Sequence, residues 1–372
     1  SSDLVIDVRM REGNSKERER SAGLGLIASK VLLEGPLKKK EGSYLVSGRF
    51  GYPGVVAGLL GSNLTSKPQM WFYDVNAKVN RTLDARNRMF FSLYSGGDHT
   101  VFNKLVKGYG MDWGNATATI RWNHILNDKT NVNTSAVFSN YYYKYKSLSD
   151  GLRYVWKSNM QSYQLKSDWE RYQNNLLTLK GGVNLHYFTT MPGEVGKSGK
   201  DSNITPSQMP RKSLWDAALY AEANYKFLPH FLLNAGVRLS VLHAPASAYY
   251  AAKTFVMPEP RAELSFIPNA SHRFSASYTQ AAQSIHMLTT SSVGIPSDMW
   301  MPANALLKPS VMRQLALGYE YNFPDKEYTL SLEAYMRRTS HVVDYRKNAD
   351  IFQNDRIEDE VETGSARGCE IG

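Results

Sequence analysis

The stretch LWDAALYAEANYKFLPHFLLNAGVRLSV, residues 214–241, alternates apolar and polar side chains, turns at Pro229 and His230, and alternates again. Successive side chains of a strand point to opposite faces, so this period of two predicts a β-hairpin with one apolar and one polar face. The apolar face carries Trp215, Ala217, Leu219, Ala221, Ala223, Tyr225 and Phe227, then Phe231, Leu233, Ala235, Val237, Leu239 and Val241. Each arm is long enough for the roughly 9–11 residues with which a tilted strand crosses a bilayer.

The composition permits a membrane barrel but no membrane helix. The chain has 372 residues, a formal net charge of +10 and a mean hydropathy of −0.42. It contains no apolar run of about 18 residues, whereas a barrel needs an apolar side chain only at every second position. The 23 Tyr and 7 Trp suit the aromatic belts of such barrels. One cysteine, Cys369, gives no disulfide framework and no cysteine metal site.

The same alternation recurs along the whole chain. Further clear examples are residues 71–83, 116–123, 177–187, 314–323 and 328–337. Because these stretches and their weaker neighbours share the period of two, we expect about fifteen strands and the start of another, with no helix of period 3.6.

The connections between the strands predict how the sheet is arranged. We expect short turns at 35–42, 84–87, around 128, and at 172–175, 229–230, 268–271 and 324–327. Long connections are expected at 12–21, 53–69, 95–111, 146–160, 189–213, 243–258, 286–312 and 339–363, in alternation with the short ones without exception. In an up-and-down meander this places all short turns at one end, as in outer-membrane barrels. The apolar face would then meet lipid and the polar face a wet or plugged lumen, because a sheet in lipid must close to pair its backbone.

Four stretches resemble one family of proteins. They are LLEGPLKKKEGSYLVSGRFGY (32–52), PEPRAELSF (258–266), IPSDMWMPANALLKPSVMRQLALGYEYNF (295–323) and GSARGCEIG (364–372). In order and spacing they resemble Bacteroidota-type TonB-dependent outer-membrane receptors along essentially the whole chain. There the first stretch follows the plug domain, the second starts a strand, the third is a loop and its strand, and the fourth is the next strand.

The resemblance implies a 22-stranded barrel filled by an N-terminal plug, with transport driven by the TonB–ExbB–ExbD system. We expect residues 1–372 to form the N-terminal two-thirds of such an antiparallel up-and-down transmembrane β-barrel, about 15–16 strands. The signal peptide, the TonB box, the plug and the last strands would lie outside it. The chain would then have two open sheet edges, would not transport alone, and would reach the TonB system through the missing N-terminal region.

Candidate ligand contacts come from two regions. Asp298 and Trp300 match the family pattern on an expected external loop, where they either touch ligand or anchor the loop to the barrel rim. Arg238 and Arg337 are expected on the polar lumen wall among charges of both signs, and the basic balance favours an anionic ligand. No catalytic residue, metal site or cofactor is predicted, because the chain has no H-E-x-x-H and no G-x-S-x-G motif.

Basic and glycine-rich runs argue against nucleic acid and nucleotides. The runs at 16–20 and 38–40 are expected on an external loop and a periplasmic turn, so they would form no joint patch for nucleic acid. The first run is a candidate to contact lipopolysaccharide phosphates. GLGLIAS (23–29) and GYPG (51–54) are interpreted as small residues in strands and not as a dinucleotide loop.

The leading hypothesis is a TonB-coupled outer-membrane uptake receptor for a scarce nutrient: a metal chelate, vitamin, glycan or peptide. It would bind and gate without bond chemistry. One alternative is a passive porin, whose 16–18 strands leave an aqueous channel. A second is a soluble secreted β-sandwich adhesin, which would need no detergent.

Overall fold

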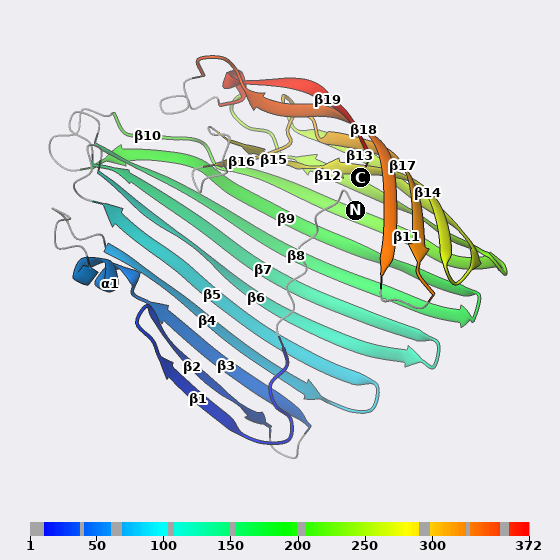
Figure 1. Ribbon diagram of the computed structural model, residues 1–372. Coiled ribbons are helices and arrows are strands. Elements are labelled where there is room, and N and C mark those ends of the chain that lie inside the picture. Colours follow the sequence, from blue (N-terminus) through cyan, green and yellow to red (C-terminus); the bar gives the residue numbers. More distant parts are fainter. Residues whose placement is uncertain are drawn as a thin grey trace.

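The computed structural model describes residues 11–37, 41–60, 69–102, 108–148, 153–198, 205–289, 298–324, 328–349 and 357–371. They form one seventeen-stranded sheet in which neighbouring strands are antiparallel (Figure 1). The sheet is a meander in chain order from β1 (Glu19–Leu24) to β19 (Val361–Ile371). The predicted fold class, an all-β antiparallel up-and-down barrel that is partial, is confirmed.

Most strands are longer than those of a soluble sheet, and β8 and β9 reach 21 residues each. Between β1 and β19 the meander contains β2 (Ala28–Pro36), β3 (Gly42–Gly51), β4 (Gln69–Thr82), β5 (Asn87–Phe102), β6 (Tyr109–Asn127), β7 (Thr130–Ser147), β8 (Tyr154–Asn174), β9 (Leu177–Lys197), β11 (Lys212–Leu228), β12 (Phe231–Ala244), β13 (Lys253–Asn269), β14 (His272–Gln283), β17 (Ser310–Asn322) and β18 (Thr329–Tyr345). The short β10 (Ser207–Gln208) adds to the end of β9, and β15 (Ile285–Leu288) and β16 (Met299–Pro302) form a separate hairpin.

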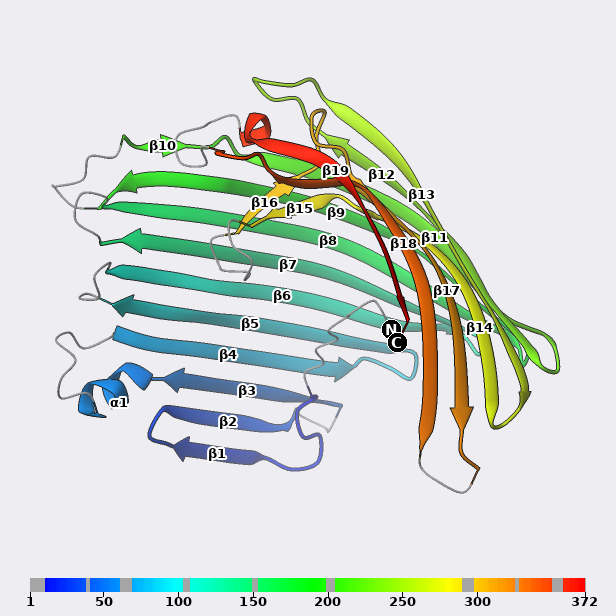
Figure 2. The same cartoon turned by 45° about the horizontal axis from the view of Figure 1, so that its top comes forward.

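The sheet curves strongly, which gives it a concave inner face and a convex outer face (Figure 2). Among the described residues, β1 pairs only with β2 and β19 only with β18, so the wall is open between them. The expected two open edges are therefore found in this part of the chain.

The two faces have the predicted polarity. Trp215, Leu219 and Leu317 on the outer face are 52%, 62% and 65% exposed, although they are large and apolar. The polar partners of the alternation, such as Arg238 and Glu222, line a cavity on the inner face. A soluble sandwich would bury the first set, so the expected orientation toward lipid is confirmed and the adhesin alternative is not supported.

Aromatic rings form belts on the outer face. Near the short turns, consecutive ring contacts connect β11 to β12, β13, β14 and β17 through Tyr225, Phe227, Phe231, Phe266, Phe274, Tyr319, His272, Tyr321 and Phe323. A second row, Phe138, Tyr163, Tyr187 and Trp215, crosses β7, β8, β9 and β11. Such belts lie at the two water interfaces of membrane barrels.

Short turns occupy one end of the sheet at all seven predicted places, although 38–40 and 325–327 lie outside the described residues. The predicted strict alternation is wrong at one point. β1 and β2 are joined at the opposite end by only Gly25–Ile27, where the Gly25 amide donates to the Ala28 carbonyl at 3.0 Å. Most long connections are shorter than expected because their strands continue; β13, for example, begins five residues before Pro258.

The run at 16–20 lies at the short-turn end, contrary to the prediction of an external loop. Glu19 pairs with Glu34 close to the end of β2, so this run lies at the same end of the sheet as the short turns. The segment before β1 is held on the inner face by Glu34, which is 1% exposed and bonds Arg11 and the Asn14 amide. The argument for a lipopolysaccharide contact by this run is therefore withdrawn.

The prediction of no helix is wrong for α1 (Pro53–Leu60), in the β3–β4 connection. Its eight residues, PGVVAGLL, are too short and too uniformly apolar to show a period of 3.6, and Pro53 suits the first helical position. GYPG therefore spans a strand end and a helix start, while Gly25–Ile27 of GLGLIAS form the β1–β2 turn. No helix among the described residues is long and apolar enough to cross a membrane.

The wall is interrupted between β13 and β14. The first residue pair is Asn269 with His272 at the short turn, and the last is Arg261 with Thr279. Beyond Arg261 and Thr279 the two strands no longer pair with each other, although β13 still pairs with β12 and β14 with β17. Pro258 and Pro260 lie in the part of β13 that has no partner strand on the β14 side, and they have no N–H to donate. Side chains bridge the gap instead: Gln280 Nε2 donates to the Pro258 carbonyl at 2.7 Å, and Glu259 accepts from the Ala282 amide at 3.0 Å. We call this interruption the β13–β14 seam.

Candidate functional site

The long connections fold inward into a layer at the mouth of the barrel. The β15–β16 hairpin packs against β9, β11 and β18. Its Leu288, Met299 and Met301 are at most 2% exposed. They form one apolar cluster with inward side chains of the wall and of other connections, namely Tyr143, Trp156, Val195, Met209, Leu307, Ile357 and Val361. The described parts of these connections therefore form an ordered layer against the inside of the wall, which we call the loop layer.

A buried ion pair ties four connections of the loop layer together. Lys212 Nζ, at the start of β11, is 2.5 Å from Glu358 Oε1 in the 3-10 helix η2 (Ile357–Glu360), and both side chains are 2% exposed. Asn304 Nδ2 donates to the same carboxylate at 3.1 Å. The ring of Tyr250, in the β12–β13 connection, lies 5.7 Å from Lys212 Nζ. Burial, and then the charge of Glu358, raise the pKa of the Tyr250 phenol.

Asp298 and Trp300, the two loop residues predicted from the sequence, both lie in the loop layer. Trp300 is half-buried on β16, where it pairs with Met287. Asp298, immediately before β16, is 8% exposed, and its Oδ1 has no hydrogen-bond partner. A buried carboxylate oxygen without a partner carries a desolvation cost, so this atom is available for a donor or cation.

Below the loop layer, the inner wall encloses a polar cavity of about 1000 Å³ that reaches the short turns. Its lining comes from β4 to β9 and β11 to β14 and carries alternating charges: Asp84, Arg86, Arg88, Lys166, Asp168, Glu170, Lys180, Glu222, Arg238, Glu259 and Arg261. At the turn, the Arg86 amide and the Asn87 side chain bond Asp84 and lower the pKa of its carboxyl. Asn123 Oδ1 and Asn133 Oδ1 are buried there without partners. The wall is therefore suited to hydrogen-bond a polar surface placed inside it.

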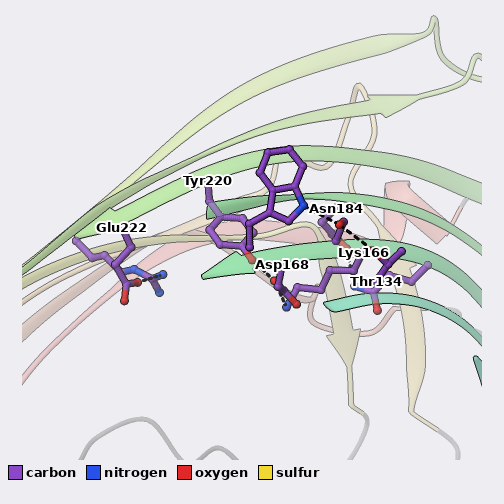
Figure 3. Close-up of polar contacts among 10 residues, drawn as sticks. Thr134, Lys166, Asp168, Asn184, Tyr220 and Glu222 are labelled. Carbon is purple, nitrogen blue, oxygen red and sulfur yellow. Dashed lines mark hydrogen bonds and ion pairs between the residues drawn. The ribbon is translucent and has the colours of Figure 1, made fainter. Parts of the chain in front are cut away.

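Inner-wall side chains reach across a strand where the strand between them carries a glycine, and Figure 3 shows Tyr220 and Asp168 meeting in this way. Gly182 on β9 pairs with Asp168 on one side and Tyr220 on the other, and Tyr220 donates its hydroxyl to Asp168 over it. Lys166 Nζ lies 3.0 Å from the same carboxylate. A Cβ on Gly182 would be 2.3 Å from the Ser167 carbonyl oxygen and 2.7 Å from the Tyr220 hydroxyl, so a larger residue does not fit.

The same arrangement recurs two strands further along the sheet. Gly236 on β12 pairs with Glu222 and Arg261, whose side chains form an ion pair across it with Nη2–Oε2 at 2.5 Å. Its added Cβ would lie 2.9 Å from the Ala221 carbonyl oxygen. We call these two sites, centred on Gly182 and Gly236, the glycine rows. In each, side chains of the two neighbouring strands meet across the glycine and link three strands on the lumen side.

The two predicted arginines lie on the inner face but not at one site. Arg238 lines the cavity, 3.6 Å from Glu259 and 3.8 Å from Asp216. Arg337 on β18 donates from Nε to Gln314 Oε1 at 2.8 Å and is not among the cavity-lining residues. The four predicted ligand contacts are therefore divided between the loop layer, the cavity and β18.

Sequence reasoning missed Lys212, Glu358 and Asn304, because 146 residues separate the ion pair and no pattern marks it. It also missed the glycine rows, although once registers were assigned, glycines amid polar alternation would have indicated them. Among the described residues, no group of three or more His, Cys, Asp or Glu is arranged to hold a metal ion.

Comparisons with known proteins agree with this geometry. Residues 58–367 match the family described as TonB dependent receptor-like, beta-barrel. No curated protein matches the sequence. Among solved structures, the ferric preacinetobactin receptor of Acinetobacter baumannii has a TM-score of 0.62 at 12% identity, over 92% of this chain and 56% of its own. The ferric-catecholate import receptor of E. coli K12 has a TM-score of 0.65 at 13% identity, over 97% and 62%.

The hemophore receptor of Serratia marcescens, solved with its hemophore and heme, has a TM-score of 0.62 at 10% identity, over 95% of this chain and 60% of its own. At such identities these structures establish the fold alone. The chain spans 56%, 62% and 60% of the length of the three receptors. Because the family match covers most of the chain and agrees with the lipid-facing meander, the chain belongs to the TonB-dependent receptor-like β-barrels of the bacterial outer membrane.

Proposed function

We propose that the chain forms the wall of a TonB-coupled receptor that takes up a scarce nutrient across the outer membrane. The observation that carries this is the combination of a lipid-facing outer surface with a polar inner cavity and an ordered loop layer packed inside the wall at the long-connection end. A passive porin needs an open aqueous channel, whereas a gated receptor needs a covered one. Residues 1–372 would be the N-terminal two-thirds of the barrel, joined to a plug and further strands in the full-length protein.

A metal chelate is the proposed cargo class. Three of the structurally similar proteins are named for ferric siderophores or heme, and their fold is shared. The net charge of +10 favours an anionic chelate through the field of the whole protein. We assign the first contact to Trp300 and Asp298 in the loop layer, while Arg238 and Arg337 stay candidates for contacts deeper in the lumen. The inner wall would seat the plug, and no bond would be made or broken.

The decisive experiment compares uptake of radioactive ferric siderophores and heme by cells that contain or lack the full-length gene, with and without TonB. Uptake should require both the gene and TonB. Uptake that needs the gene but continues without TonB would instead favour the porin. A panel in which no metal chelate is transported, but a vitamin, glycan or peptide is, would overturn the cargo class and leave the TonB coupling standing.

Two variants test whether cargo binding depends on the loop layer and not on the barrel wall in general. Trp300→Ala should weaken cargo binding by cells, since it removes a half-buried aromatic surface from the loop layer. Leu219→Phe on the lipid-facing side is the matched control and should bind cargo like the wild type. Equal loss in both variants would indicate misfolding, and no loss in either would exclude Trp300 as a contact.

A further inference from the structure

Three arginines stand in one row on the outer face. Arg313 of β17 is directly opposite Arg338 of β18, which is directly opposite Arg367 of β19. All three are exposed, and they belong to adjacent strands (Figure 1). Like charges opposite each other on neighbouring strands repel, with Cβ atoms about 4.5–5.5 Å apart. A row of three is therefore unfavourable unless something negative lies against it.

Among the described residues, this face carries no such charge between the short turns and the bulge at His341. From the short turns up to the bulge at His341, the outward positions of β14, β17 and β18 carry no Asp or Glu, because Glu320 and Glu333 fall on the inward positions. Arg313 Nε donates to Gln280 Oε1 at 2.9 Å, a neutral partner that holds it in place. Within the described part of the chain, the side chains of Arg338 and Arg367 make no hydrogen bond and no ion pair.

An apolar hollow begins directly beside the row. One outward position toward the short turns, Leu315, Met336 and Cys369 replace the three arginines. They lie along a hollow of about 690 Å³ in the outer wall. Its floor alternates large and small side chains across five strands, in the paired order Leu264, Ala276, Leu317, Ala334 and Ile371. The alanines leave grooves between the larger side chains, and a second hollow extends them to Phe266 and Phe274.

The row lies on the long-connection side of the apolar hollow. The long connections of this family face outside, so the arginines stand at the external border of the apolar band. Guanidinium groups bind phosphate oxygens in bidentate fashion, and two strand spacings of about 4.8 Å make the row roughly 10 Å long. Two phosphate groups on one headgroup fit that length, with acyl chains continuing into the hollow.

We propose that this face binds the lipid A part of lipopolysaccharide, with its phosphates on Arg313, Arg338 and Arg367 and its acyl chains over Ala276 and Ala334. The site is separate from the lumen and does not depend on which cargo the protein carries. It replaces the run at 16–20 as the contact of this chain with lipopolysaccharide.

The test measures binding of lipid A by the full-length protein, purified from outer membranes and stripped of lipid, using native mass spectrometry. Arg338→Gln combined with Arg367→Gln should lower lipid A affinity by roughly tenfold or more per arginine. Arg171→Gln is the matched control, because Arg171 is also an exposed outward arginine but stands at the short-turn end of β8. Wild-type protein should bind lipid A far better than the same lipid with its phosphates removed.

Further measurements distinguish lipid A from a lipid without phosphates and from free phosphate. Ala276→Trp should fill the hollow and weaken lipid A while leaving the arginines in place. The proposal is overturned if dephosphorylated lipid binds as well as lipid A, or if the double variant retains wild-type affinity. It is also overturned if inorganic phosphate alone binds with the same arginine dependence and displaces lipid A at equal concentration. Unchanged heat-modifiability of each variant in gels shows that the barrel is still folded.

Discussion

At the scale of single residues, Gly182 lets Tyr220 reach Asp168 across β9 because it has no side chain. A Cβ there meets the Ser167 carbonyl oxygen at 2.3 Å, and backbone cannot give way as a flexible side chain would. Gly182→Ala should therefore lower the free energy of unfolding by about 1–3 kcal/mol, the usual cost of overpacking. Urea titration in lipid vesicles measures it.

Gly196 on the same strand is the matched control, since nothing lies within 4 Å of its added Cβ. Gly196→Ala should be close to neutral. Equal effects of the two substitutions would show that the Asp168–Tyr220 contact over Gly182 has no energetic importance.

The buried pair Lys212–Glu358 predicts a non-additive double-mutant cycle. Glu358→Gln leaves a buried lysine unpaired and should destabilise the loop layer by about 3–5 kcal/mol, whereas Lys212→Met combined with Glu358→Leu should recover most of that loss. Hydrogen exchange of the β15 and β16 amides reports the stability of the layer. Additive effects of the two single substitutions would contradict a direct pair.

His286 on β15 predicts a pH dependence of the loop layer. Burial lowers its pKa below the ordinary 6.5, and the nearby His341 acts in the same direction, while the Lys308 carbonyl, at 3.1 Å from Nε2, opposes them. The opened layer therefore binds protons more readily than the folded one as the pH falls below about 6.5. Protection of β15 and β16 should be constant above that pH and decrease below it.

His286→Gln removes the titrating group and should make this protection less dependent on pH between 7.5 and 5.5. If the variant keeps the full wild-type pH dependence, another group is responsible.

At the scale of the strand, the alternation itself makes a prediction. Leu219 faces lipid near the middle of β11, and Asn224 on the same strand faces the lumen. Leu219→Arg should cost about 2–4 kcal/mol of folding free energy in a bilayer, while Asn224→Arg should cost much less. Folding titrations in vesicles compare the two. A larger cost at Asn224 would mean that the faces are reversed.

Strands and their faces were predictable from the sequence because a period of two repeated over many residues is a strong signal, as in β11 and β12. The short turns were predictable because each follows a strand end directly. The β1–β2 turn and α1 were not, since three residues and eight residues contain too few positions to show a pattern. The placement of residues 16–20 failed with them, because one missed turn exchanges the two ends of the sheet.

At the scale of the whole molecule, the sequence located the candidate site only in part. It placed Trp300 on a loop and Arg238 on the lumen wall, but it could not show that the loops fold together through Lys212 and Glu358. That contact is decided by tertiary packing, which has no local signature. The row of arginines was likewise invisible until cross-strand registers were known, although each arginine could be seen in the sequence.

The β13–β14 seam predicts where the wall exchanges hydrogen first. Backbone amides of β14 beyond Thr279 are paired on the β17 side alone, and the other side depends on Glu259 and Gln280. Glu259→Ala should therefore raise exchange at Ala282 strongly and leave the middle of β11 unchanged. Equal protection in variant and wild type would show that Glu259 does not seal the seam.

At the β13–β14 seam two prolines lack backbone donors and side chains bridge the strands instead. The curved wall therefore consists of two groups of strands, β1 to β13 and β14 to β19, which backbone pairing joins only near the short turn. Mechanical strain on the wall would concentrate there, because the long-connection end of β13 can move away from β14 while the pairs from Arg261–Thr279 to Asn269–His272 stay intact as a hinge. The molecule therefore has a built-in line of weakness at a defined point on its circumference.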